Sequence, residues 1–218
     1  MKRVRSLGLC LVASVAVSAT TAASASAALP EFTGPFSKPF TSTIKASSFE
    51  TVGGVKLQCK AGTDTGEIVG PQNGSMKMVF TGCQLKKVPC NTPGAAAGVI
   101  ATNLLTMKIN YISKPKKQVG VDLLEPGGGP FMTYGCGPTL RGVVVGSVIG
   151  RIGPINKLVT PSATFTLSFM QTAGIQKVTK LEGQPPDILE TTFGGPFSQT
   201  GLASTDQILF GEPVKLIA

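Results

Sequence analysis

The sequence contains no histidine and no tryptophan. Without histidine, Ser-His-Asp and Cys-His catalysis are excluded, and so is any metal site built on imidazole. Without tryptophan, the usual stacking surface for sugar rings is missing, and Tyr111 and Tyr134 are the remaining substitutes. Acid-base chemistry near neutral pH would then depend on a carboxyl or a lysine with a shifted pKa. We therefore expect that the protein is not an enzyme.

Motifs for cofactors and metal ions are also missing. Calcium loops of the D-x-D-x-D-G type do not occur, because Asp64, Asp122 and Asp206 are isolated in the sequence. The glycines at 127–129 lack the following Gly-Lys-Ser/Thr of a phosphate-binding loop, and no S-x-x-K element lies on a plausible helix. The sequence therefore predicts no cofactor and no metal site.

Paired carboxylates are the chemistry that a glycoside hydrolase would need. The acidic residues considered for this role are Glu125, Glu182, Asp187 and Glu190. Their spacing in sequence does not show whether two of them approach within the roughly 5 to 10 Å that the mechanism requires. We interpret them as solvated loop residues.

The N-terminus has the order of a secretory signal: a basic segment, an apolar segment over residues 7–17 and the small-residue triplet Ala25-Ser26-Ala27. The sequence predicts cleavage after Ala27, which makes residues 1–27 a signal peptide and residues 28–218 one extracellular domain. Cys10 is part of the discarded signal in this interpretation, because Leu9 does not suit a lipid-attachment site. No later apolar run is long enough to span a membrane.

The mature chain is basic. It retains 17 of the 20 Lys and Arg residues against 11 Asp and Glu residues. This balance favours weak association with anionic polymers, such as those of a cell envelope. The lysine clusters at 86–87 and 114–117 lie among turn-forming residues and lack the interleaved aromatics of a nucleic-acid surface. No nucleic-acid partner is expected.

Four cysteines remain after the signal: Cys59, Cys83, Cys90 and Cys136. An even number in an oxidising compartment predicts two disulfides, whereas zinc is disfavoured because there is no C-x-x-C pair and no histidine. The short connection between Cys83 and Cys90 favours a bridge between them, which leaves Cys59 with Cys136. The pairing of Cys59 with Cys83 and of Cys90 with Cys136 is only slightly less favoured.

Apolar residues alternate with polar ones through most of the mature chain, as in Met76, Met78 and Phe80. This period is typical of half-buried strands, and the 27 glycines and 16 prolines would break most long helices. Two hairpins are expected, residues 100–112 with 119–124 and residues 164–171 with 176–181; further strands are expected at 55–59, 131–136, 140–152, 207–210 and 214–217. The sequence thus predicts an all-β, antiparallel sandwich or barrel-like single domain. We interpret Phe32, Phe36 and Phe40 as plugs for hydrophobic gaps.

Several short motifs resemble a group of uncharacterised exported β-rich proteins of actinobacteria: Ala28-Leu29-Pro30-Glu31-Phe32, Thr81-Gly82-Cys83, the segment 89–96, the segment 146–150 and the segment 201–206. The resemblance covers nearly all of the mature chain. It implies export and a single domain, and it implies no activity or functional residue.

Three functions remain as hypotheses. The first is a non-catalytic secreted or cell-envelope protein with a binding or structural role. The second is a barrel that carries a small apolar ligand, which would need a continuous internal cavity of a few hundred Å³. The third is a hydrolase of envelope polysaccharide, which would need two carboxylates facing each other in a cleft.

Overall fold

The computed structural model describes residues 28–218, which form twenty β-strands and no helix. All strand pairings are antiparallel, and the predicted all-β single domain is confirmed. The predicted signal peptide, including Cys10, lies outside the described residues. Among residues 28–218, no helix has the length and apolar character needed to cross a membrane.

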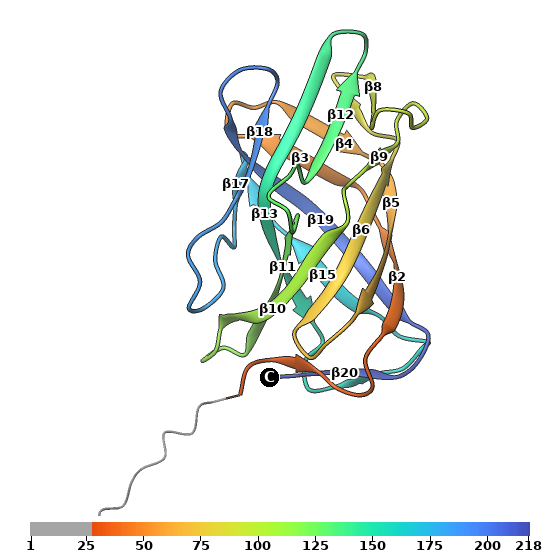
Figure 1. Ribbon diagram of the computed structural model, residues 1–218, viewed down its shortest axis with the longest axis vertical. Coiled ribbons are helices and arrows are strands. Elements are labelled where there is room, and N and C mark those ends of the chain that lie inside the picture. The colour runs from red at the N-terminus through yellow and green to blue at the C-terminus, as the bar shows by residue number, and fades with distance from the viewer. Residues whose placement is uncertain (1–27) are drawn as a thin grey trace, which may run out of the picture.

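Eight strands close on themselves into a ring, which we call the lower ring (Figure 1). Around the ring, β10 pairs with β11, β11 with β13, β13 with β15, β15 with β19, β19 with β2, β2 with β5, β5 with β6, and β6 again with β10. The strands are β2 (Lys38–Ile44), β5 (Ala61–Ile68), β6 (Asn73–Thr81), β10 (Leu105–Ser113), β11 (Gln118–Leu124), β13 (Leu140–Gly153), β15 (Phe165–Phe169) and β19 (Ser198–Phe210).

A second closed ring, the upper ring, stands on the first and shares its two longest strands, β13 and β19. The first halves of these strands take part in the order β13, β18, β19, β3, β4, β7, β8, β12 and back to β13. The additional strands are β3 (Ser47–Thr51), β4 (Lys56–Cys59), β7 (Gln84–Leu85), β8 (Val88–Asn91), β12 (Met132–Cys136) and β18 (Leu189–Thr192). Two shared strands therefore hold both rings in one domain.

Short strands complete the fold. A three-stranded sheet of β1 (Glu31–Phe32), β14 (Leu158–Val159) and β20 (Val214–Ile217) lies across the lower end in Figure 1. Phe32 from this sheet contacts the rings of Phe165 and Phe210, with centroids 5.8 and 6.1 Å apart, so it closes the end with apolar surface. The remaining strands are β9 (Ile100–Ala101), which pairs with β6, and the hairpin of β16 (Gln171–Thr172) and β17 (Ile175–Gln176).

Side chains fill the interior of the lower ring. The alternating pattern of β6 turns Met76, Met78 and Phe80 inward, and all three are fully buried. Burial of each such side chain contributes about 1.5–3 kcal/mol. Phe32 and Phe40 are buried as expected, whereas the plug role of Phe36 is wrong, because it lies in the bend between β1 and β2 with 39% of its surface exposed.

Three predicted strand boundaries are wrong. The strand expected at 207–210 is only the end of β19, which begins at Ser198. The first hairpin strand begins at Leu105, because Ile100–Ala101 forms β9 against β6 instead of extending β10. The expected hairpin of 164–171 with 176–181 is wrong in its pairing, because β15 pairs with β13 and β19. Only β16 and β17 form a hairpin here, and its second strand ends at Gln176. Residues 177–188 instead form an irregular segment, which we call the covering loop, and its Leu181 is buried on the outer wall of the lower ring.

The two predicted disulfides are present, but the favoured pairing is wrong. Cys59 is bonded to Cys83, and Cys90 is bonded to Cys136. Cys83 and Cys90 are neighbours, since the Cys90 amide donates to the Cys83 carbonyl at 3.0 Å, but the register of β8 with β12 sets Cys90 directly opposite Cys136. Two disulfides are compatible with an extracellular protein.

Candidate functional site

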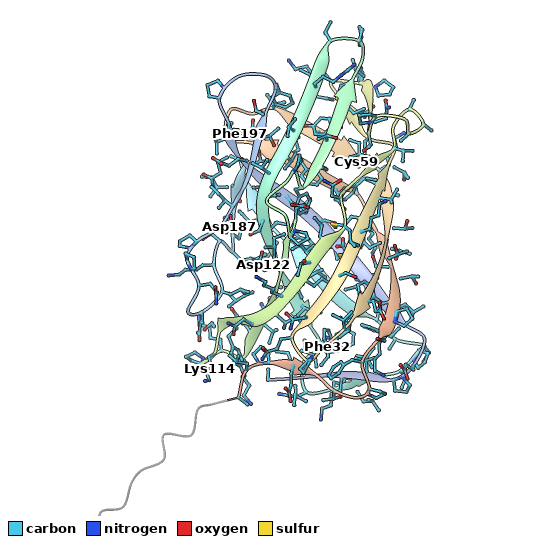
Figure 2. All side chains as sticks on the ribbon, viewed as in Figure 1. Phe32, Cys59, Lys114, Asp122, Asp187 and Phe197 are labelled. Carbon is cyan, nitrogen blue, oxygen red and sulfur yellow. A yellow bond between two sulfur atoms is a disulfide. The ribbon has the colours of Figure 1, made fainter. Side chains whose placement is uncertain are left out.

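A pocket of about 370 Å³ lies on the outside of the lower ring, beneath the covering loop; we call it the outer pocket. On the wall, Asp122 of β11 stands opposite Lys108 of β10 and Ile149 of β13. Asp187 from the covering loop lines the same pocket, together with several side-chain amides, among them that of Asn110. Figure 2 shows Asp122 and Asp187 at the same part of the wall. The outer pocket therefore joins two carboxyl groups, one ammonium group and amides in one cavity.

Backbone hydrogen bonds hold the covering loop against β10. The Glu182 amide donates to the Tyr111 carbonyl at 2.7 Å, and the Asn110 side-chain amide donates to the Glu182 carbonyl at 3.2 Å. Within the loop, the Asp187 amide donates to the Thr179 carbonyl at 2.8 Å. The Asp187 carboxylate then accepts the amide of Ile188, also at 2.8 Å, which fixes its direction.

Asp122 is the more buried of the two acids. Its pKa is raised from 3.8 to about 6. Burial is the main cause, and the negative charge of Asp187 acts in the same sense, against the opposing effects of the Ser147 hydroxyl and the Lys108 ammonium group. Its Oδ1 atom is buried and has no hydrogen-bond partner among residues 28–218. An unsatisfied buried acceptor favours a ligand that donates a hydrogen bond.

The structure brings together a different pair of acids from the set considered in the sequence. Asp187 is in the outer pocket, but its partner is Asp122, which lies 65 positions earlier on a strand. The carboxylate of Glu182, which lies in the covering loop, accepts a hydrogen bond from the Lys114 backbone amide at 2.7 Å. The interpretation of Glu190 as a loop residue is wrong, because it lies within β18 opposite Val145.

Glu125 caps a turn instead of facing another acid. Its carboxylate accepts the amides of Gly127 and Gly129 at 2.9 and 2.5 Å, which gives the glycine cluster a defined turn. The four half-cystines occupy the upper ring, on or beside β4, β7, β8 and β12, away from the outer pocket. They are structural residues of that ring.

A second group of acids was missed from the sequence. Asp64 of β5 and Asp206 of β19 point into the lower ring and are 1% and 0% exposed. They appear isolated in the sequence because 141 positions separate them. The available signal was positional: both occupy inward places of alternating strands, where a carboxyl is unusual.

Comparisons with protein-family models, with curated proteins and with solved structures find no match for this chain.

Proposed function

We propose that this chain is a non-catalytic exported protein, of the cell envelope or the surrounding medium, that binds a small polar ligand in the outer pocket. The observation that carries the proposal is a pocket of about 370 Å³ in which Asp122, Asp187 and Lys108 meet side-chain amides and apolar surface. Ligand sites in proteins combine these features at volumes from about 300 Å³ upward. The predicted signal and the two disulfides support export.

The lining favours a ligand rich in hydroxyl groups, such as a sugar unit. The carboxylates can accept hydrogen bonds from sugar hydroxyls, and the side-chain amides of Asn73 and Gln184 can both accept and donate them. Leu181 and Ile149 offer apolar contact for the C–H face of a ring. Two carboxylates against one lysine disfavour an anionic group inside the pocket. Association with anionic envelope polymers would instead use the basic exterior.

Hydrolysis of envelope polysaccharide is a second candidate, because Asp122 and Asp187 interact electrostatically in one pocket. A carboxyl with a pKa of about 6 beside an exposed carboxylate is the combination of acid and base that glycoside hydrolysis uses. Binding and hydrolysis use the same pocket, and they differ in whether the bound sugar is released unchanged.

The carrier hypothesis has less support. A carrier needs internal space, and the inward-facing side chains of the lower ring, including Met78, Leu123 and Leu167, are fully buried against one another. The outer pocket is partly polar and lies on the outside of this wall.

The test is a titration of the ¹⁵N-labelled mature chain, residues 28–218, with a panel of neutral sugars, amino sugars and uronic acids. We expect shifts of amide signals in the covering loop and in β10 and β11 with neutral or amino sugars. The D187N variant should lose these shifts, whereas E190Q, an acidic position outside the pocket, should keep them. Sugar release that depends on Asp122 would support the hydrolase, and shifts elsewhere would contradict the assigned pocket.

A further inference from the structure

Two aspartates enter the lower ring from the strands on either side of β2. Asp64 of β5 lies opposite Ser42, and Asp206 of β19 lies opposite Ile44. Because Ser42 and Ile44 are alternate inward residues of one strand, the two carboxyls approach each other diagonally across β2. We call Asp64 and Asp206 the buried carboxyl pair.

Each carboxyl of the pair is hydrogen-bonded on one oxygen and unpartnered on the other. The Ser42 hydroxyl donates to Asp64 Oδ2, and the Ser204 hydroxyl donates to Asp206 Oδ1 at 2.5 Å. Asp64 Oδ1 and Asp206 Oδ2 are buried and have no hydrogen-bond partner among the described residues. Two ionised groups in this state would need a counter-charge from the residues around them.

No described positive charge lies beside the pair to compensate it. The neighbours in register are apolar: Met78 of β6 opposite Asp64 and Leu167 of β15 opposite Asp206. Among the described residues, the inward positions of β6, β11 and β15, and of β13 within the lower ring, carry apolar side chains or glycine.

The other titratable groups that face inward have partners of their own. Lys38 of β2 is separated from Ser42 by Phe40 and forms an ion pair with Glu212 at 2.8 Å. Tyr111 of β10 directs its hydroxyl to the Ala28 carbonyl at 3.4 Å. The buried carboxyl pair therefore has to be neutralised by something other than a side chain.

We propose that the lower ring encloses a proton-binding site, in which the buried carboxyl pair carries at least one proton at neutral pH. Protonation removes a buried negative charge and turns an unpartnered acceptor into a donor. A metal ion fits less well, because four of the six side-chain oxygens of the pair and its two serines are engaged in the two hydrogen bonds. Only Asp64 Oδ1 and Asp206 Oδ2 are left, whereas calcium takes six to eight ligands. No group of three or more acidic or cysteine side chains is placed for a metal within residues 28–218.

The electrostatics agree with this geometry. Burial raises the pKa of Asp64 from 3.8 to about 7, against the hydrogen bond from Ser42. Burial and the charge of Asp64 raise the pKa of Asp206 well above 3.8. The folded chain thus holds protons that the unfolded chain releases, so the contribution of these protons to stability is complete below pH 3.8. For Asp64 this contribution is lost as the pH rises to about 7, and for Asp206 it is lost as the pH rises through its raised pKa.

The direct test is carboxyl ¹³C NMR of the mature chain labelled at aspartate. The sequence contains four aspartates, Asp64, Asp122, Asp187 and Asp206, and single Asn variants assign their signals. We expect the signals of Asp64 and Asp206 together to show at least one protonated carboxyl at pH 7. Signals of both Asp64 and Asp206 that titrate near pH 4 would overturn the proposal.

Urea unfolding of the same chain between pH 5 and pH 8 gives a second readout. For each proton that unfolding releases, the unfolding constant should rise about tenfold per pH unit. The D64N/D206N double variant should lose the part of this pH dependence that comes from the buried carboxyl pair. It should retain the part that comes from Asp122. E67Q, a change at an outward position on the same strand as Asp64, should retain the full slope.

Elemental analysis separates a proton from a metal. We expect the purified chain to contain no stoichiometric calcium, magnesium or sodium, and we expect the pH profile to survive dialysis against a chelator. A bound cation that disappears in D206N would overturn the proposal, and so would an unfolding profile that does not change with pH in the wild-type chain.

Discussion

The carboxyl of Asp122 links the outer pocket to pH. Because its pKa is raised to about 6, it changes from mostly ionised to mostly protonated as the pH falls from 7 to 5. A ligand that donates a hydrogen bond to the ionised form should therefore bind about tenfold more weakly at pH 5 than at pH 7. Isothermal titration across this range checks the expectation. An affinity that rises on acidification would contradict it.

Gly146 of β13 allows β18 and the end of the covering loop to approach the wall. Its φ is +89°, and a Cβ atom there would lie 2.0 Å from the Ile188 carbonyl oxygen, next to Asp187. G146A should therefore destabilise the fold by about 2–5 kcal/mol and displace Asp187 from the outer pocket. Urea unfolding checks the first effect and ligand affinity the second.

The matched control is G211A, because a Cβ atom at Gly211 meets nothing within 4 Å and its φ is not in the left-handed region. A change of less than about 0.5 kcal/mol is expected for it. Equal stability of G146A and G211A would contradict the role given to Gly146.

At the scale of elements, the disulfides join strands that are neighbours in the upper ring. The bond between Cys90 and Cys136 ties β8 to β12 and closes a sequence separation of 46. On the chain-entropy model, its loss in C90S/C136S should cost about 4 kcal/mol. The loss of the bond from Cys59 to Cys83, with a separation of 24, should cost slightly less.

Peptide mapping of the non-reduced protein checks the connectivity itself. Linked peptides containing Cys59 with Cys83 and Cys90 with Cys136 are expected. A peptide that links Cys83 to Cys90 would contradict the register of β8 with β12.

These bonds also mark a limit of inference from sequence. The alternation of apolar and polar residues identified strands such as 76–80, because consecutive residues of a strand point to opposite faces of the sheet. Pairing between strands is not local: the short connection from Cys83 to Cys90 does bring their backbones together, yet the ring register assigns each cysteine to another partner. The covering loop escaped prediction for the same reason, since Leu181 finds its contacts on the outside of β11 and β13.

At the scale of the whole molecule, the all-β class was predictable from composition and period, whereas the closure into two stacked rings was not. Closure depends on β13 and β19, each long enough to serve both rings, and the sequence indicated only the last four residues of β19. The two pairs of acidic residues likewise form only in the tertiary structure. Asp122 meets Asp187 because a loop folds back on the wall, and Asp64 meets Asp206 because β2 separates their strands.

The central claim is that the outer pocket binds a sugar-like ligand without converting it. The most direct test of this claim is calorimetric titration of residues 28–218 with the tightest-binding ligand from the sugar panel. The sugar recovered from the calorimeter cell is then analysed. We predict saturable binding to the wild-type chain and to E190Q, at least tenfold weaker binding to D187N, and unchanged sugar. Equal binding by D187N, or recovery of a cleaved sugar, would contradict the account.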